Sequence, residues 1–152
     1  MTTLRLEYTD NDTLHDDLVL HFAGARWVGD SYYLALDNKL LPKEEDAPKI
    51  RCVLRRLLEQ WLEAIAQMPI HGTRYLAFDF QDQGTGWLRC ISTPEGFLVC
   101  VGYSSLEGWA ISPSDLGAAM LQRNDFRPYS SEVEMSQAQL REAIEQSLSK
   151  AL

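Results

Sequence analysis

The sequence predicts an α+β fold in which antiparallel sheets pack around one long central helix, with a short helix and a C-terminal helix beside it. Residues 47–68 repeat apolar side chains at helical spacing, and the segments before and after them alternate apolar with polar residues, as half-buried strands do. No repeat, low-complexity tract or linker divides the 152 residues. We therefore expect residues 1–152 to form a single α+β domain.

Three strands are expected before the long helix, in residues 3–10, 16–24 and 26–38. The first alternates leucine and tyrosine with charged or polar residues, and the other two are rich in β-branched and aromatic side chains, which favour strands. Gly24 and Gly29 are expected at turns or bulges. The first forty residues are thus expected to form an antiparallel meander.

The central helix is the strongest local signal in the chain. Asp46 is its expected N-cap, and Pro48 lies in the first turn, where a missing N–H is harmless. Pro69 and Gly72 stop it. The side chains expected to face the core share one helical stripe and are Ile50, Val53, Leu54, Leu57, Leu58, Trp61, Leu62 and Ile65. Those expected on the other, solvated side are Lys49, Arg51, Arg55, Arg56, Glu59 and Glu63.

Three further strands are expected after the helix, in residues 73–80, 86–92 and 97–105. The stretch FDFQDQGTGWLR, residues 78–89, predicts the end of a strand and a hairpin, with Gly84 and Gly86 permitting the turn. Trp61, Trp87 and Trp27 are all expected in the core.

The C-terminal part is expected to contain two helices. A short one is predicted in residues 112–123, followed by a polar, strand-like connector in residues 126–136. Ser136 and Gln139 have the spacing of a capping box. They predict a last helix whose inward-facing residues are Leu140, Ile144 and Leu148.

The chain does not match the sequence patterns of common metal and catalytic sites. A calcium loop that started at Asp10 would need glycine where His15 stands, and three scattered histidines lack zinc spacing. Ser104 lies in GYSSLEG, without the second glycine or the strand-to-helix context of a nucleophile elbow. Asp79 and Asp82 would point to opposite faces of a strand unless a bulge intervenes. We therefore expect no metal, no cofactor and no enzymatic activity.

The net charge of the chain limits the classes of partner that it is expected to bind. Asp and Glu number 22 against 14 Lys and Arg, a formal net charge of −8. Such a chain is expected to bind neither nucleic acid nor anionic membranes, because phosphate binding needs clustered cations, and to favour a basic protein. No apolar run approaches the ~20 residues that span a bilayer, and the first residues lack a secretory pattern. We expect a cytoplasmic protein whose three cysteines remain thiols.

Three segments together resemble small cytoplasmic immunity proteins of bacterial contact-dependent or polymorphic toxin systems. They are VLRRLLEQWLEAI, RYLAFDFQDQGTGWLR and VGYSSLEGWAISPSD, within roughly residues 50–115. The resemblance implies a non-enzymatic inhibitor that binds one cognate toxin domain, one to one, inside the producing cell. Many such toxins are basic nucleases, which the acidity of this chain would complement.

The contacts expected for such an inhibitor are acids grouped in turns, together with two aromatic residues that would be exposed anchors. They are Asp10, Asp12, Asp16, Asp17, Glu44, Glu45, Asp46, Asp79, Asp82, Glu107, Tyr103 and Trp109. Each acid also has a simpler interpretation, the solvation of a loop. The alternative functions are a small enzyme or small-molecule-binding domain with a pocket between the sheet and the central helix, and an accessory subunit of a larger complex.

Overall fold

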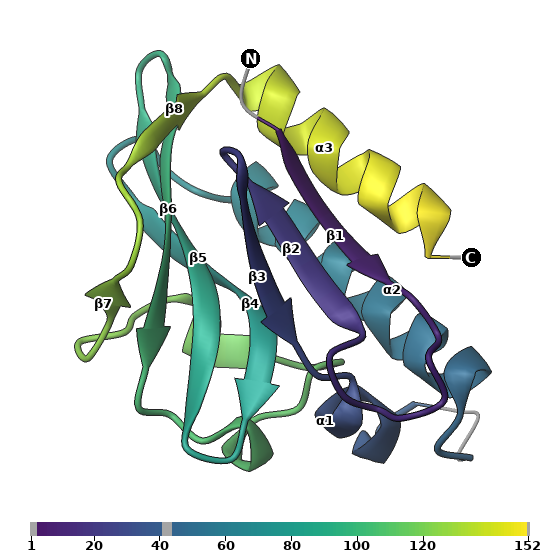
Figure 1. The fold of residues 1–152 in the computed structure, drawn as a ribbon. Helices are drawn as coiled ribbons and strands as arrows, with labels where there is room; N and C mark the ends of the chain where they lie inside the picture. Colours follow the sequence, from purple (N-terminus) through teal and green to yellow (C-terminus); the bar gives the residue numbers. More distant parts are fainter. Residues whose placement is uncertain (1–2, 41–43, 152) are drawn as a thin grey trace.

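The chain folds into two antiparallel sheets, two long helices and several short turns (Figure 1). The computed structural model describes residues 3–40 and 44–151. Its strands are β1 (Leu4–Tyr8), β2 (Leu18–Phe22), β3 (Ala25–Gly29), β4 (Thr73–Gln81), β5 (Gly84–Thr93), β6 (Gly96–Ser104), β7 (Arg127–Pro128) and β8 (Val133–Met135). Its helices are α1 (Tyr32–Leu36), α2 (Ala47–Ala66) and α3 (Gln137–Lys150), with the 3₁₀ turns η1 (Gly108–Ala110) and η2 (Gly117–Met120). The predicted α+β class is confirmed.

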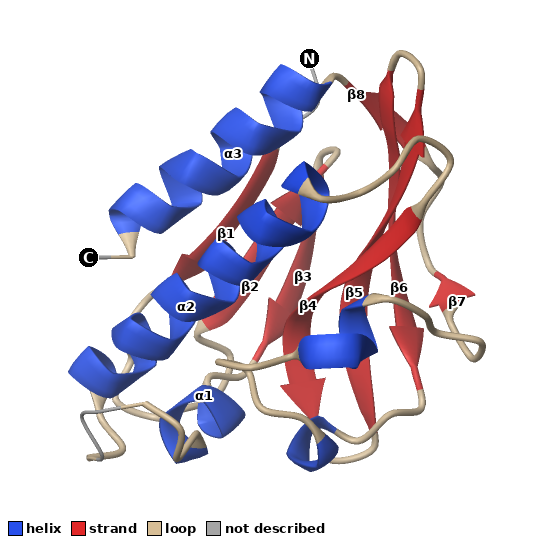
Figure 2. Cartoon of the chain, turned by 180° about the vertical axis from the view of Figure 1, so that it is seen from behind, coloured by secondary structure: helices blue, strands red, loops and turns tan. Residues whose placement is uncertain are grey.

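The smaller sheet has the strand order β1-β2-β3, and α2 and α3 lie side by side across one of its faces (Figure 2). Leu20 of β2 pairs with Leu6 of β1 and with Trp27 of β3. Leu6 and Leu20 are fully buried and Trp27 is half-buried, as expected where alternate residues of a strand face the helices. Gly24, at φ 83°, forms the β2–β3 turn together with Ala23.

The predicted third strand is wrong beyond Gly29, because residues 32–36 form the short helix α1. The carboxylate of Asp17 accepts hydrogen bonds from the backbone N–H and the hydroxyl of Ser31, at 2.8 and 2.6 Å. These bonds turn the chain away from the sheet directly after β3. A short run of aromatic and aliphatic residues fits either a strand or a buried helical turn, and here the tertiary contact decides.

The larger sheet contains β4, β5 and β6 in chain order, while β7 and β8 both pair with the remaining edge of β6. The predicted hairpin is confirmed, with Asp82 and Gln83 as the turn. Gly84 and Gly86 lie inside β5 rather than in the turn, which corrects their predicted role. A Cβ on Gly84 would lie 2.7 Å from the carbonyl oxygen of Ser104, so glycine is needed there for the close approach of β6.

Helix α2 begins as the sequence predicts, with the side chain of Asp46 accepting a hydrogen bond from the backbone N–H of Lys49. Most of the predicted stripe is buried, and the indole N–H of Trp61 donates to the carbonyl oxygen of Ala77 at 3.0 Å. Lys49 was expected in solvent, but it is 2% exposed. The start of α2 is therefore covered on more sides than a single apolar stripe implies.

The helix predicted for residues 112–123 is reduced to the 3₁₀ turn η2. The buried side chain of Gln60, on α2, donates to the carbonyl oxygen of Pro113 at 2.8 Å and accepts from the backbone N–H of Leu116 at 2.7 Å. These backbone groups are thus bonded to α2 instead of to a helical ladder. Gly117, at φ 57°, takes a left-handed conformation that a helix cannot continue.

The C-terminal helix α3 has the predicted capping box, in which Ser136 and Gln139 each bond to the backbone N–H of the other. Leu140 and Ile144 are buried as expected. The hydroxyl of Ser147 accepts a hydrogen bond from the backbone N–H of Leu6 at 3.1 Å. This bond fixes α3 against the first strand of the chain.

The buried apolar side chains of both sheets and of all three helices form one continuous core. Cys90 and Cys100 are both buried free thiols, and Cys90 belongs to this core. Because Cys90 is paired with Val99 while Cys100 is paired with Arg89, the two cysteines face opposite sides of the sheet. Among the described residues, no helix combines the length and the apolar character that crossing a membrane requires.

Candidate functional site: an acidic end of the molecule

Several long segments of the chain and the short β4–β5 turn meet at one end of the molecule, the lower end in Figure 1. They are the β1–β2 loop, the segment around α1, the start of α2, the β4–β5 turn and the segment that carries η1. We call this region the acidic end and define it by its exposed or half-buried carboxylates. They are Asp10, Asp12, Asp16, Asp30, Glu44, Glu45, Asp46, Asp82, Glu107 and Asp115.

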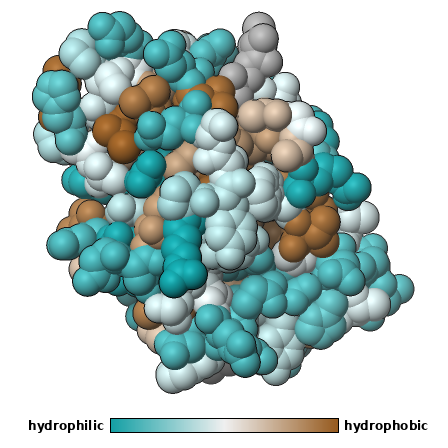
Figure 3. All heavy atoms as spheres, turned by 60° about the vertical axis from the view of Figure 1, so that its left-hand side comes forward, coloured by the Kyte–Doolittle hydropathy of each residue, from teal (hydrophilic) through white to brown (hydrophobic). Residues whose placement is uncertain are grey.

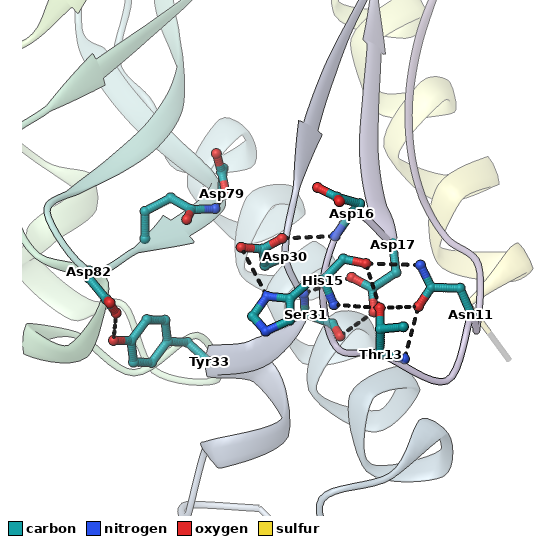
Figure 4. Close-up of polar contacts among 11 residues, drawn as sticks. Asn11, Thr13, His15, Asp16, Asp17, Asp30, Ser31, Tyr33, Asp79 and Asp82 are labelled. Atoms are coloured by element: carbon teal, nitrogen blue, oxygen red, sulfur yellow. Dashed lines mark hydrogen bonds and ion pairs between the residues drawn. The ribbon is translucent and has the colours of Figure 1, made fainter.

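Ion pairs and hydrogen bonds join these connections to one another. His15 of the β1–β2 loop forms an ion pair with Asp30 at 3.4 Å, and the same carboxylate accepts a hydrogen bond from the backbone N–H of Asp16 at 2.8 Å (Figure 4). Lys39 forms an ion pair with Asp115 at 3.0 Å. Acids that lie far apart in the sequence therefore belong to one surface. Hydrophilic side chains also dominate the lower part of the face in Figure 3, where apolar residues lie in small separate areas.

The β1–β2 loop is held by its own polar side chains. The side chain of Asn11 accepts from the backbone N–H and the hydroxyl of Thr13, and its amide donates to the carbonyl oxygen of His15 at 2.9 Å. Asp12, Leu14 and Asp16 have positive φ angles of 64°, 66° and 56°. Such backbone angles persist in non-glycine residues only where neighbouring bonds enforce them. The backbone that carries the exposed carboxylates of this loop is thus ordered by hydrogen bonds.

Two of the predicted contact residues are buried, which corrects their placement. Asp17 and Asp79 are 2% and 3% exposed, so a partner protein on the surface does not reach their carboxylates. Asp17 fixes Ser31, as described above. A third buried aspartate, Asp37, accepts hydrogen bonds from the backbone N–H groups of Lys39 and Ser114. These inner aspartates bind neighbouring connections together beneath the outer ones.

Asp79 lies where the two sheets meet, in a space that glycines leave open. A Cβ on Gly29 of β3 would lie 2.5 Å from its carboxylate, and one on Gly86 of β5 would lie 3.0 Å from its Cβ. A register shift lies between Ala77 and Asp79, before both aspartates, whereas residues 79–81 pair in regular register, so it is not the bulge between Asp79 and Asp82 that the sequence left open. Burial raises the pKa of Asp79, although hydrogen bonds from Gln81 and Tyr103 partly oppose this.

Tyr103 is half-buried rather than exposed, because its hydroxyl donates to Asp79 at 3.1 Å and its ring lies 6.1 Å from that of Phe78, centroid to centroid. Burial and the neighbouring Asp79 raise the pKa of its phenol. Tyr103 therefore belongs to the junction between the sheets, and the prediction of an exposed anchor at this position is wrong.

Asp82, in contrast, is exposed at the β4–β5 turn and accepts a hydrogen bond from the hydroxyl of Tyr33 on α1 (Figure 4). This bond raises the pKa of Tyr33 to about 12, so the phenol remains a donor throughout the neutral range. The pair connects the larger sheet to the helix that follows the smaller one. It orders the surface while leaving Asp82 accessible.

Trp109 is the exposed aromatic residue that the sequence predicts, at 65% exposure. It lies on η1, whose first residue, Gly108, is packed directly on β4. A Cβ on Gly108 would lie 2.8 Å from the backbone nitrogen and oxygen of Gln81. The hydroxyl of Thr85 also donates to the carbonyl oxygen of Leu106 at 2.6 Å. The backbone beneath the exposed indole is therefore fixed.

Several residues of the acidic end were missed by sequence reasoning. Asp30 and Asp115 were not selected, and Tyr32 and Leu36, each 38% exposed, were assigned to a strand. The signal that could have found the last two is the Asp-Ser pair before YYLAL, since Asp and Ser often precede a helix. The residues of the N-terminal loop and of the start of α2 do meet, because Asp10, Asp12, Glu45 and Asp46 line one hollow of about 600 Å³.

The alternative of a pocket between a sheet and the central helix receives little support. That space is filled by the core. A hollow of about 100 Å³ lies instead where α2 and α3 meet β1, and Arg5, Arg51 and Lys150 are among its lining residues. Within residues 3–40 and 44–151, no group of three or more His, Cys, Asp or Glu side chains could hold a metal ion.

The electrostatic effect of the acidic end is visible at Tyr8, the last residue of β1. Its pKa is raised to about 12, first by burial and then by the carboxylates of Asp10 and Asp17. Asp10 of the acidic end thus acts on the last residue of β1.

Comparisons of the chain with protein-family models, with curated proteins and with solved structures find no match.

Proposed function

We propose that this chain is an immunity protein, which binds a basic toxin domain one to one through its acidic end and thereby neutralises it. The observation that carries the proposal is the gathering of exposed carboxylates from five separate connections at one end of the fold. The resemblance of residues 50–115 to immunity proteins of bacterial toxin systems gives the proposal its biological setting, the cytoplasm of the producing cell.

Charge would act mainly on the rate of association. A surface rich in carboxylates attracts a basic partner over a distance of about 10 Å at moderate salt and steers it into the right orientation. Lys39 and His15, which lie in this region, are paired with Asp115 and Asp30, so they offset the charge of these two carboxylates and not that of the other eight. Steering explains speed and selectivity, while tight binding needs additional contacts.

Order in the free protein would support tight binding. The inner aspartates Asp17 and Asp37, together with the Tyr33–Asp82 bond, hold the connections of the acidic end before any partner arrives. A surface that is already ordered loses less conformational entropy on association. The exposed indole of Trp109 supplies the kind of side chain in which interfaces concentrate their binding energy.

Inhibition would follow from occupancy of the partner's cationic groove. A nuclease binds the phosphates of its substrate with clustered Lys and Arg side chains. An acidic protein surface competes for the same side chains. In this proposal the chain needs no catalytic residue and no cofactor, because covering the substrate groove is enough.

Co-expression with the toxic domain encoded beside this chain tests the proposal. Survival of the host and co-purification of a one-to-one complex are expected. A complex that leaves the toxin fully active, or the absence of any complex, would refute it. A variant with Asp12→Asn, Asp16→Asn and Glu45→Gln is the informative comparison, since all three side chains are exposed.

A further inference from the structure

A groove with aromatic walls lies within the acidic end, between α1 and the segment that follows η1. It has a volume of about 250 Å³, and its lining includes Tyr33, Leu36, Trp109, Ile111 and Pro113. Trp109 is 65% and Leu36 is 38% exposed. Apolar side chains that remain exposed to water together in one groove indicate a site of contact with a partner.

Carboxylates border this groove. Asp37 is one of its lining residues. Because it is buried and both of its oxygens accept from backbone N–H groups, it adds negative charge to the groove rather than a direct contact. Asp82 is bonded to Tyr33, a wall residue. Glu107 lies two residues before Trp109 and is half-exposed. The groove therefore combines aromatic faces with negative charge.

We propose that the groove between α1 and η1 receives an arginine side chain of the toxin domain, stacked on Trp109 and facing the exposed carboxylate of Asp82. Arginine fits this combination better than lysine, because its planar guanidinium stacks on aromatic rings, is weakly hydrated and bonds carboxylates in a fixed fork. The inference rests on the proposed function, since it names the chemistry of the partner at the same surface.

The walls of the groove are fixed in the free protein. Gly108 packs on the backbone of Gln81, and Thr85 holds Leu106 at 2.6 Å. On the opposite wall, Tyr33 is held by Asp82. A bound arginine would thus meet ordered partners, which limits the entropy lost on binding.

The inference is tested by measuring the affinity of the toxin domain for a Trp109→Ala variant of this chain. The dissociation constant is expected to rise at least about 30-fold, the range of an interface hot spot. Ile70→Ala is the matched control, because Ile70 is 62% exposed and lies between α2 and β4, away from the acidic end. Both variants remove an exposed side chain, so both are expected to fold normally, as thermal unfolding will show.

The outcomes separate the two proposals. If the wild-type chain forms no complex, the proposed function fails. If the wild-type complex forms and Trp109→Ala binds as tightly as Ile70→Ala does, the groove inference fails while the proposed function stands. A selective loss for Trp109→Ala supports both.

A peptide titration tests the arginine itself without any toxin. The probes are acetyl-Gly-Arg-Gly-amide, its lysine counterpart and its citrulline counterpart, which is isosteric with arginine but uncharged. The readout is the indole N–H resonance of Trp109, assigned through the Trp109→Ala variant. A saturable shift that is largest for arginine is expected. Equal shifts for arginine and citrulline, or no shift with arginine, would overturn the inference.

Discussion

The two ends of the molecule are built from the same strands but turn the chain in different ways. At the upper end in Figure 1, β2 and β3 are joined by Ala23 and Gly24 alone, and β5 and β6 by Pro94 and Glu95. At the acidic end, the β1–β2 loop and the segments around α1 and η1 are long. Charges of both signs lie near the upper end, including Arg26, Arg74, Glu95 and Glu134, whereas carboxylates dominate the acidic end.

This difference suggests a division of roles, in which the short turns serve the stability of the fold and the long connections serve the recognition of a partner. A two-residue turn has little surface to offer a partner and mainly sets the register of its strands. Long connections over a fixed scaffold can carry binding residues, but they must be ordered by something other than a sheet ladder. Here the inner aspartates provide that order, while the outer ones remain exposed. Aspartate thus has two roles at one end of the molecule.

Asp17→Ala is expected to have the largest effect on stability. It leaves the buried N–H and hydroxyl of Ser31 without their shared acceptor, and hydrogen bonds to charged groups are worth about 1.5 to 3 kcal/mol each. We expect the free energy of unfolding to fall by about 3 kcal/mol in urea denaturation. Asp16→Asn, at the adjacent exposed residue, should change it by less than about 0.5 kcal/mol, because asparagine tolerates the φ of 56° at this position. Equal losses for both variants would contradict the division into inner and outer aspartates.

Neutralising outer carboxylates is expected to slow association without weakening the fold. The triple variant Asp12→Asn, Asp16→Asn, Glu45→Gln should lower the association rate with a toxin domain about tenfold or more at low salt. The matched control Glu95→Gln, Glu134→Gln, Glu142→Gln removes the same charge from exposed positions elsewhere. Stopped-flow measurements at several salt concentrations make the comparison. Equal slowing in both variants would assign the effect to net charge rather than to the acidic end.

The pKa of Asp79 predicts a pH dependence of stability. Burial raises it above its ordinary value of 3.8, so between that value and the raised one the folded state binds more protons than the unfolded state. The contribution of Asp79 therefore strengthens as pH falls through this window and weakens as pH rises, by at most about 1.4 kcal/mol per pH unit. Relative to Asp79→Asn, which does not titrate at this position, the wild type should gain stability as pH falls through this window towards 3.8. A difference that is constant with pH would show that Asp79 titrates normally.

A change at the opposite end is expected to have the smallest effect. Ala23 has a φ of 52° in the β2–β3 turn, a conformation that costs an L-residue about 1 kcal/mol. Ala23→Gly relieves this strain but adds freedom to the unfolded chain, so we expect a gain of about 0.5 kcal/mol. Thermal unfolding measures it, and toxin affinity should be unchanged. A change in affinity would mean that the upper end also takes part in binding.

Sequence periodicity predicted the parts of the fold that repeat a local pattern. The caps of α2 and α3, the buried stripe around Trp61 and the β4–β5 hairpin all follow from spacing and residue type. Residue spacing predicted α1 and η2 wrongly. At these places the side chains of Asp17 and Gln60, which are distant in sequence, accept hydrogen bonds from the backbone. These long-range hydrogen bonds are not encoded in any local pattern, although the Asp-Ser pair before YYLAL is a local signal for α1.

The candidate site shows the same limit. The sequence supplied the acids and selected Trp109, but it treated Asp17 and Asp79 as equivalent to Asp12 and Asp16. Burial alone distinguishes them, and burial depends on which segments pack over each residue.

The sequence by itself determined the α+β class, the long helix and the excess of negative charge, since these depend on local spacing and composition. Only the tertiary structure decided where that charge is displayed. The connections that carry it meet because antiparallel strands return their ends to the same side of the molecule. They also meet because Gly29, Gly86 and Gly108 leave room for neighbouring segments of the chain to pack closely. These contacts join residues far apart in the chain, and so they divide the aspartates into those that hold the surface and those that form it.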